Sequence, residues 1–247
     1  MRITIIGSGD AFGSGGRFNT CFIIETQDKK ILLDFGASSL VALKARGIDP
    51  NSIDGIFLSH LHGDHYGGLP FLLLDFQFLS RRERPFAISG PPTTRERLKA
   101  AMEAFFPRSS TSKWRFPLEV SEVTPDVPDR FLGLSVSTTE VVHFSGAPST
   151  AVRLSDGRST LAYSGDTEWT DALIKVAGGA DLFITECYEY ARELTGHMCW
   201  TTLKSKLPQL KARTIMLTHM NPSMLAKADE ARAAGVLVAE DGLTIEI

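Results

Sequence analysis

The chain has 247 residues, of which 43% are hydrophobic, and a formal net charge of −3. This length and composition allow one sizeable hydrophobic core, and no low-complexity stretch or charge block marks a linker, so we expect a single domain over residues 1–247. The slightly negative net charge excludes the global basic field that drives non-specific binding to nucleic acids.

Short apolar and β-branched runs predict strands along the whole chain, at 2–6, 21–26, 30–34, 55–59, 86–89, 131–136, 138–142, 149–154, 159–163, 181–185, 213–217 and 243–247. Helical periodicity is found between them, at about 37–46, 66–82, 93–106, 168–177, 199–207 and 223–234. In each half, strand pairs come first and are followed by strands that alternate with helices. This order predicts an α/β fold of four layers, αββα, in which two central sheets lie between two layers of helices.

The three cysteines, Cys21, Cys187 and Cys199, are an odd number without paired spacing. They indicate a reducing compartment rather than a disulfide scaffold. Residues 1–7 have the pattern of a strand and not of a secretory signal. We therefore expect a cytoplasmic protein that does not span a membrane.

The predicted helix at 66–82 contains an unusually apolar segment, from Phe71 to Leu79. This segment is too short to cross a bilayer. A helix that is apolar nearly all round must be covered on more than one side. We expect it to lie in the core and also to contact a second copy of the chain, which would make the protein a homodimer.

The segment from Arg81 to Arg115 carries nine Lys or Arg residues against three Glu, a local charge of +6. Two interpretations of this basic segment are open. It is either the solvated face of a helix with its flanking loops, or a rim that attracts phosphate.

The sequence from His60 to His65, His-Leu-His-Gly-Asp-His, places four potential metal ligands within six residues. It follows a predicted buried strand, and ligand sites in α/β proteins lie at the carboxyl ends of strands. Imidazole and carboxylate groups suit Zn²⁺, Mn²⁺ or Fe²⁺, and the absence of cysteine from the motif disfavours a structural zinc site. The motif therefore predicts a metal site with a role other than holding the fold together.

Three further candidate ligands, His143, Asp166 and His219, also follow predicted strands. Any one of them alone would fit a hydrogen-bonded structural role. Because the same strand-end position recurs in all three and in the motif, we expect them to converge at one edge of the sandwich.

These residues, in this order and together with Leu32-Leu33-Asp34-Phe35-Gly36, resemble the metallo-β-lactamase superfamily across nearly the whole chain. The resemblance implies the four-layer sandwich of that superfamily and a dinuclear site, in which Asp166 bridges two metal ions. One ion would be bound by His60, His62 and His143, and the other by Asp64, His65 and His219. Asp34 would orient one of the ligands. We expect two Zn²⁺ ions, with Mn²⁺ or Fe²⁺ as alternatives, and hydrolysis as the reaction, because such a pair lowers the pKa of a shared water and clamps the attacking and leaving oxygens.

Within the superfamily, Gly7-Ser8-Gly9 and Ser164-Gly165-Asp166-Thr167 are similar to motifs of the ribonuclease Z and cyclic phosphodiesterase branch. In that branch a Glu at the end of a late strand and a His about ten residues later lie beside the metals, and Glu186 and His197 match them. A phosphodiester needs its leaving alkoxide protonated, and a histidine beside a carboxylate can supply the proton. We expect His197 to be the general acid with Glu186 as its partner, and Asp64 to be both a ligand and a catalytic residue.

Ribonuclease Z proper carries a long arm before the bridging Asp that grips tRNA. Here only 22 residues lie between His143 and Asp166, and two predicted strands fill them. We therefore expect a small phosphodiester substrate, a cyclic nucleotide or a ribose cyclic phosphate, and we regard nucleic acid as the less favoured partner.

Three alternatives stay open. The first is 3′ processing of tRNA, with the basic segment Arg81–Arg115 in place of the arm, and it predicts a steep salt dependence. The second, hydrolysis of a carboxylic ester or lactone, leaves Glu186 and His197 unexplained. The third is a non-catalytic binding role, and the intact ligand set argues against it because unused buried polar groups cost stability.

Four aromatic residues lie near these motifs in the sequence: Phe144, Tyr188, Tyr190 and Trp200. We expect them to pack against the protein rather than to stack on a substrate, because burial of aromatic rings is a large source of packing energy.

Overall fold

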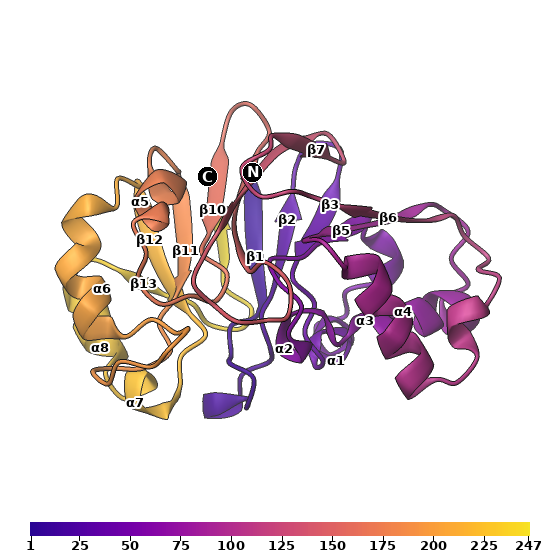
Figure 1. Ribbon diagram of the computed structural model, residues 1–247, viewed down its shortest axis with the longest axis horizontal. Coiled ribbons are helices and arrows are strands. Elements are labelled where there is room, and N and C mark those ends of the chain that lie inside the picture. Colours follow the sequence, from indigo (N-terminus) through magenta and orange to yellow (C-terminus); the bar gives the residue numbers. More distant parts are fainter.

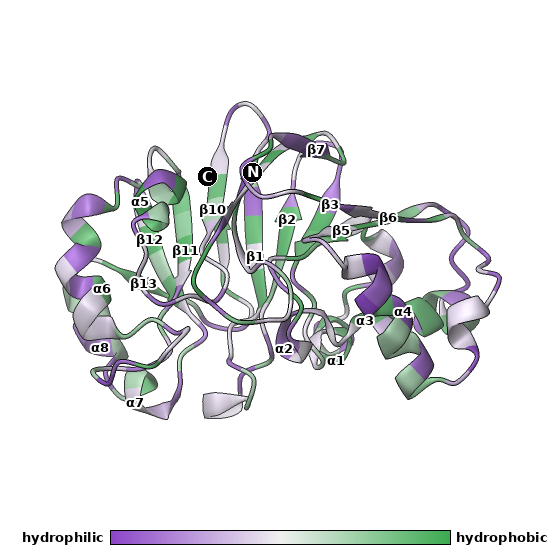
Figure 2. Ribbon diagram, in the orientation of Figure 1, coloured by the Kyte–Doolittle hydropathy of each residue, from purple (hydrophilic) through white to green (hydrophobic).

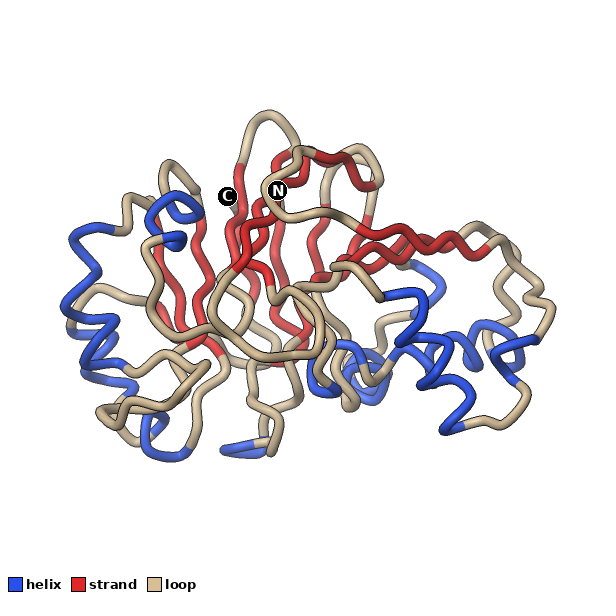
Figure 3. The backbone as a smooth tube through the Cα atoms, in the orientation of Figure 1, coloured by secondary structure: helices blue, strands red, loops and turns tan.

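The computed structural model describes residues 1–247. Two seven-stranded sheets lie at the centre of the molecule, and helices cover the outer face of each sheet (Figure 1). Figure 3 shows the two groups of helices on opposite sides of the strands. The predicted α/β fold, a four-layer αββα sandwich, is therefore confirmed.

The strand order is β14-β1-β2-β3-β4-β5-β6 in the first sheet and β13-β12-β11-β10-β9-β8-β7 in the second. The first sheet consists of β1 (Arg2–Gly7), β2 (Cys21–Glu25), β3 (Lys30–Leu33), β4 (Gly55–Phe57), β5 (Phe86–Gly90), β6 (Leu118–Glu122) and β14 (Thr244–Glu246). The second consists of β7 (Asp129–Phe131), β8 (Leu134–Glu140), β9 (Thr150–Ser155), β10 (Thr160–Tyr163), β11 (Leu182–Glu186), β12 (Thr214–Thr218) and β13 (Leu237–Val238). In both halves antiparallel pairs come first and parallel pairs follow. The final strand β14 returns to the first sheet and pairs with β1.

The helices follow the same division between the two halves. The first half contains α1 (Ser39–Ala45), α2 (Gly63–Tyr66), α3 (Leu69–Leu74) and α4 (Thr94–Phe105). The second contains α5 (Ala172–Ala177), α6 (Trp200–Lys206), α7 (Pro222–Leu225) and α8 (Ala228–Ala233). Short 3₁₀ turns lie at Ser14–Gly16, Pro50–Ser52, Ser109–Thr111 and Leu207–Gln209, and a π-helical turn lies at Asp75–Leu79. No helix combines the length and the apolar character needed to cross a membrane.

Apolar side chains on alternate faces of the strands fill three apolar layers, one between the two sheets and one under the helices of each half. In β2, Phe22 and Ile24 belong to the cluster between the sheets, whereas Cys21 and Ile23 belong to the cluster under the helices of the first half. This is the two-residue period of a strand that is buried on both faces. Phe22 meets Tyr163 of the second sheet edge-on, with ring centroids 5.4 Å apart. In Figure 2 the central strands are accordingly mostly green, and purple residues gather on the helices and loops.

The segment after the metal-ligand motif differs from the single helix predicted at 66–82. It is divided into α2, α3 and the π-helical turn Asp75–Leu79. The helical hydrogen bonds are interrupted between α2 and α3, where Gly68 N–H donates to the carbonyl of Phe35. Pro70 lies in the first turn of α3, where its missing N–H has no cost. The side chains also divide: Leu72, Leu73 and Phe76 are buried, whereas Phe71, Phe78 and Leu79 are exposed.

Two strand predictions also differ from the structure, and two further strands were missed. Leu132 and Gly133, both with positive φ, make a tight turn inside the predicted strand 131–136, which is therefore the hairpin β7–β8. The predicted strand 138–142 is largely the end of β8. Strands β6 and β13 were not predicted. β6 is an edge strand with mostly exposed polar residues, and β13 has only two residues, so neither has a clear apolar pattern.

The basic segment Arg81–Arg115 does not form one continuous surface. Arg82 is buried between the rings of Phe76 and Phe86 and donates hydrogen bonds to three backbone carbonyl groups. Arg84 pairs with Asp54 at 2.7 Å. Other basic residues of the segment are exposed along α4. These positions favour a solvated helix face with structural arginines beside it over a phosphate-binding rim.

Candidate metal centre

The predicted site residues meet where six strands end. Asp34 follows β3, His60 follows β4, His143 follows β8, Asp166 follows β10, Glu186 ends β11 and His219 follows β12. These strands run in the same direction within each sheet, so their carboxyl ends share one edge of the sandwich, at the bottom of the view in Figure 1. The structure thus brings together residues that lie far apart in the sequence.

The loop between β4 and α2 sets the spacing of the ligand motif. His62 precedes the first residue of α2, and Asp64 and His65 lie in its single turn. This turn packs tightly on the segment after β3: Phe35 N–H donates to the carbonyl of His65 at 2.6 Å, and a Cβ on Gly36 would lie only 2.0 Å from the carbonyl oxygen of Asp64. Glycine is therefore required at position 36 for the two segments to approach.

The first group of candidate ligands consists of His60, His62 and His143, whose ligand atoms all lie within 4.8 Å of one another. His62 Nδ1 lies 2.9 Å from His143 Nε2. On the other side of its ring, His143 Nδ1 lies 2.7 Å from the carbonyl oxygen of Gly196. That carbonyl can only accept, so Nδ1 carries the proton and Nε2 has a free lone pair toward the group.

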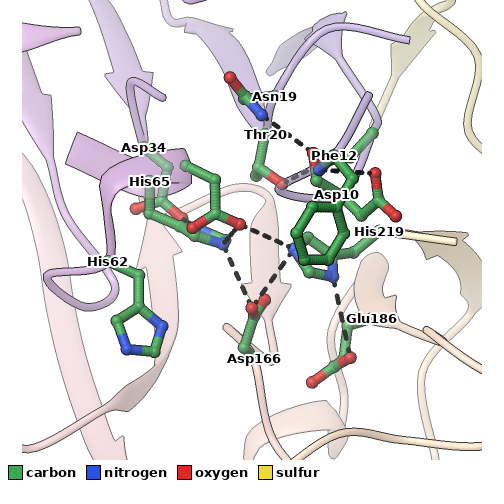
Figure 4. A network of polar contacts seen from close by, with 12 residues as sticks. Asp10, Phe12, Asn19, Thr20, Asp34, His62, His65, Asp166, Glu186 and His219 are labelled. Carbon is green, nitrogen blue, oxygen red and sulfur yellow. Dashed lines mark hydrogen bonds and ion pairs between the residues drawn. The ribbon is translucent and has the colours of Figure 1, made fainter. Parts of the chain in front are cut away.

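The second group consists of Asp64, His65, Asp166 and His219, again within 4.8 Å. His65 Nε2 lies 3.4 Å from Asp64 Oδ2 and 3.3 Å from Asp166 Oδ2, and His219 Nε2 lies 3.1 Å and 3.3 Å from the same two atoms. His60 Nε2 of the first group lies 3.9 Å from Asp166 Oδ2. Asp166 therefore lies between the two groups, and Figure 4 shows it in contact with both His65 and His219.

Several buried polar atoms at the centre of this cluster have no hydrogen-bond partner, among them His60 Nε2, His65 Nε2 and Asp166 Oδ1. Leaving such an atom unpaired costs on the order of 1–3 kcal/mol. Imidazole nitrogens and carboxylate oxygens that face a common centre are suitable ligands for a borderline divalent cation. The donor set and its unpaired atoms thus fit a divalent metal site.

The two carboxylates control the protonation of the histidines around them. Burial lowers the pKa of His60 well below its ordinary value. Burial has the same tendency at His219, but the carboxylates of Asp166 and Asp64 outweigh it and raise the pKa of His219 to about 9. The pKa of His65 is likewise raised well above its ordinary value. Protons on these two histidines balance the carboxylates in the metal-free protein, and bound cations would take their place.

Asp34 orients one ligand of the second group through a fully buried network. Its Oδ2 accepts hydrogen bonds from His65 Nδ1 and Ser59 Oγ, both at 2.7 Å, and its Oδ1 accepts from Ser59 N–H at 2.7 Å. Ser59 Oγ also lies 3.1 Å from His60 Nδ1. The sequence predicted the part played by Asp34 but missed Ser59, whose only signal was a hydroxyl directly before the motif.

Two residues of the cluster have left-handed backbone conformations, Asp34 and His219, each with φ of 59°. Asp and His occupy this region more readily than most residues, although at a conformational cost. Such strain is retained where surrounding structure holds the residue in place, commonly at functional sites.

Glu186 and His197 form the pair that the sequence predicted. His197 Nδ1 lies 3.1 Å from Glu186 Oε2, and Glu186 is fully buried whereas a quarter of the His197 side chain is exposed. Burial opposes protonation of His197, but the hydrogen bond to Glu186 outweighs it and raises the pKa of His197. Glu186 Oε2 also lies 4.0 Å from His219 Nδ1 (Figure 4). The imidazole of His197 is therefore placed beside the second ligand group, with access to solvent.

The aromatic residues near the site behave differently from one another. Trp200 is fully buried and packs as expected, and Tyr190 packs partly buried beside it. The packing prediction is wrong for Phe144, which directly follows His143 and is 90% exposed. Phe12, which the sequence analysis missed, is 81% exposed in a glycine-rich loop that begins at Ser8, whose carbonyl accepts from His219 N–H at 3.0 Å. Local sequence gave no signal of either exposure.

Known proteins share this fold and are related to this chain in sequence. Ribonuclease Z of Mycobacterium sp. (strain KMS) is 25% identical over 253 residues, which cover 96% of this chain and 82% of the relative. The Bacillus subtilis (strain 168) protein named "Probable metallo-hydrolase YhfI" is 27% identical over 231 residues, 89% of this chain and 87% of the relative. The crystal structure of YhfI has the same fold, with a TM-score of 0.80 at 22% identity and 99% of each chain covered. The short form of human tRNase Z also has this fold, with a TM-score of 0.80 at 23% identity, covering 100% of this chain and 99% of that one.

The fold and the cluster together define the class of the protein. It is a metal-dependent hydrolase of the metallo-β-lactamase superfamily, in the branch of ribonuclease Z and related phosphodiesterases. Within that class, a family model described as "Anti-Pycsar protein Apyc1" matches residues 1–241, and the chain belongs to this family.

Proposed function

We propose that this hydrolase is a phosphodiesterase with two divalent metal ions. His60, His62 and His143 would hold one ion, Asp64, His65 and His219 the other, and Asp166 would bridge them. The two ligand groups and the central position of Asp166 support this assignment. We infer Zn²⁺ as the metal from the predominance of imidazole ligands, with Mn²⁺ or Fe²⁺ as alternatives.

The observation that carries the proposal is the pair formed by His197 and Glu186 beside the ligand groups. A pair of divalent ions would supply a water of lowered pKa and would stabilise the attacking and leaving oxygens. The alkoxide that leaves a phosphodiester still needs a proton, and His197 can deliver it from the exposed side of its ring. Glu186 holds His197 by its Nδ1, which leaves Nε2 to meet the leaving oxygen. Asp64, which contacts His219 and His65, would take part in catalysis by holding the second ion.

The substrate we propose is a small one, a cyclic nucleotide or a ribose phosphodiester. The interval between His143 and Asp166 is occupied by β9 and β10 of the second sheet, which leaves no arm for gripping a folded RNA. The net charge of −3 and the divided basic segment also disfavour a large polyanion. The ribonuclease Z relative supports phosphodiester chemistry and keeps a tRNA 3′ endonuclease as the second candidate.

We also propose a homodimer of single-domain chains. Four of the large apolar side chains that are exposed in the first half lie in α3, in the π-helical turn after it and in α4: Phe71, Phe78, Leu79 and Phe105. Phe71 of α3 lies close to Phe105 of α4, with ring centroids 5.8 Å apart, and Phe78 and Leu79 follow α3 in the π-helical turn. A second copy would cover these side chains, and light scattering of the wild type and of Phe78→Ser would test it. The buried unpaired cysteines are consistent with a cytoplasmic location.

The test of function is turnover of three substrates by metal-reconstituted protein: bis(p-nitrophenyl) phosphate, p-nitrophenyl phosphate and p-nitrophenyl acetate. Preference for the diester supports the proposal and leads to a comparison of cyclic nucleotides with precursor tRNA over a range of salt concentrations. Preference for the acetate would replace the phosphodiesterase proposal with ester or lactone hydrolysis. Asp166→Ala should lose metal and diester turnover together, and full metal content in that variant would contradict the bridging role.

A further inference from the structure

Gly196 is hydrogen-bonded to the surroundings of the candidate site through both its N–H and its carbonyl group. Its N–H donates to Glu168 Oε2 at 2.9 Å, and its carbonyl accepts from His143 Nδ1 at 2.7 Å. Gly196 is buried with φ of 80°, and a Cβ there would lie 3.1 Å from His143 Nδ1. The next residue in the chain is His197. A single residue thus links a candidate metal ligand to the candidate general acid.

The backbone of Glu168 is held close to the same ligand. Glu168 N–H donates to the carbonyl of Val142 at 3.2 Å, and Val142 directly precedes His143. Thr167 Oγ1 accepts from Val142 N–H at 3.0 Å and donates to the carbonyl of Glu168 at 2.7 Å. The turn that follows Asp166 is therefore tied to the end of the segment that carries His143, and the Glu168 side chain extends from it to Gly196.

The Glu168 carboxylate makes one hydrogen bond, to Gly196 N–H, and belongs to none of the groups that could hold a metal ion. We propose that Glu168 is a positioning residue that acts through Gly196. It holds the Gly196 carbonyl where it keeps the proton of His143 on Nδ1, and it holds His197 within reach of Glu186. The part that concerns His197 rests on the proposed function, whereas the part that concerns His143 rests on the ligand geometry alone.

The effect of Glu168 on His143 has a physical reason: a metal-binding imidazole needs a hydrogen-bond partner for its second nitrogen. A ligating histidine usually donates its other N–H to a carbonyl or carboxylate, which sets the tautomer and the ring orientation. Here the partner is a carbonyl in the loop between β11 and α6. Backbone hydrogen bonds hold this loop at Glu189 and at His197, and Glu168 is the side chain that holds it at Gly196 N–H, on the same residue as the carbonyl that pairs with His143.

Three substitutions of Glu168 separate the effect of its hydrogen bond to Gly196 N–H from the effect of its negative charge. Glu168→Gln removes the charge but keeps an oxygen that can accept from Gly196 N–H. Glu168→Asp keeps the charge but is shorter by one methylene, about 1.5 Å. Glu168→Ala removes both. Glu193→Ala is the matched control, because Glu193 is exposed in the same loop.

The first measurement is the Zn²⁺ affinity of each site, by competition with a chromogenic chelator, which needs no substrate. We expect Glu168→Asp and Glu168→Ala to weaken one of the two Zn²⁺ ions by roughly 10–100-fold, the usual effect of losing a partner behind a ligand. Glu168→Gln and Glu193→Ala should bind both ions as the wild type does. The second measurement is the ratio of turnover for diesters with nitrophenolate and alkoxide leaving groups, which should rise in the Asp and Ala variants because His197 is displaced.

Unchanged Zn²⁺ affinities in Glu168→Ala would overturn the proposal. So would weak binding by Glu168→Gln together with normal binding by Glu168→Asp, because charge and not the hydrogen bond would then be responsible. If Glu168→Ala does not fold, the Gln and Asp variants still decide between these outcomes. If the wild type binds Zn²⁺ but cleaves no diester, the proposed function fails, whereas the Zn²⁺ affinities still decide the effect of Glu168 on His143.

Discussion

Replacement of Asp34 by Asn tests how strongly metal binding depends on one buried carboxylate. Asp34 receives three hydrogen bonds, two from Ser59 and one from His65. Asn has the same shape and also tolerates the left-handed backbone at this position, so no backbone strain is added. The substitution therefore changes one oxygen acceptor into an NH₂ donor and alters little else.

The Asn amide can satisfy only one side of this network. In the wild type, Asp34 lets His65 keep the proton on Nδ1 when Nε2 gives up its proton to a cation. If the oxygen of the Asn amide stays with Ser59 N–H, its NH₂ group faces His65 Nδ1, and the neutral ring keeps its proton on Nε2, the atom that faces Asp64 and Asp166. That proton has to leave before a cation binds, and we expect a loss of roughly 10–100-fold in affinity, equivalent to about 1.4–2.7 kcal/mol. If the amide is reversed, Ser59 N–H loses its acceptor inside the protein, which costs about 1–3 kcal/mol of folding free energy.

Both consequences are measurable in the same pair of assays. Zn²⁺ affinity is determined by chelator competition, and the free energy of unfolding is determined in urea on metal-free protein. Asp28→Asn is the control, because it makes the same change of charge at an exposed residue. Asp34→Asn must be weaker than this control in at least one of the two assays; equality in both would refute the role assigned to Asp34.

His197→Ala should keep its metal but lose about 10²–10⁴-fold in turnover of diesters with alkoxide leaving groups, and much less with nitrophenolate, which leaves without a proton. Equal losses on both substrates would exclude general acid catalysis by His197. Phe144→Ala should leave the unfolding midpoint unchanged because the ring is 90% exposed, but stacking worth about 1–3 kcal/mol should be lost for a cyclic nucleotide. A base-free ribose cyclic phosphate should be unaffected, and a loss in the exposed control Phe78→Ala as well would show that the effect is not local. Hydrogen bonds from Lys204, Tyr190 and Trp200 lower the pKa of Glu230 to about 2, so its contribution to stability is present above the unfolded pKa near 4.5 and is lost as the pH falls toward 2. The difference in urea midpoint between wild type and Glu230→Gln should therefore shrink on acidification, and a difference that does not change with pH would contradict this.

The sequence alone determined the layers of the fold and the composition of the ligand groups. Strand alternation and short helical repeats are local patterns, and burial on both faces of a strand such as β2 is visible in its apolar run. The motif from His60 to His65 is also local, because one strand end and one helical turn hold all of its ligands. The recurrence of candidate ligands at the ends of other predicted strands predicted that these residues meet, and the resemblance to the superfamily implied how they divide into two ligand groups.

Tertiary structure alone decided how those residues are held and what surrounds them. His62 and His143 are 81 residues apart, and the Gly196 carbonyl that orients His143 is a further 53 residues along the chain. The partners Ser59, Glu168 and Gly196 have no distinctive local pattern, since their contacts depend on which segments pack together. Exposure is decided in the same way: Phe144 is exposed and Trp200 is buried because different parts of the chain cover them. Local sequence sets the hydrophobic period of each strand or helix and the position of the turns. The orientation and the solvent access of a side chain depend instead on contacts between distant segments.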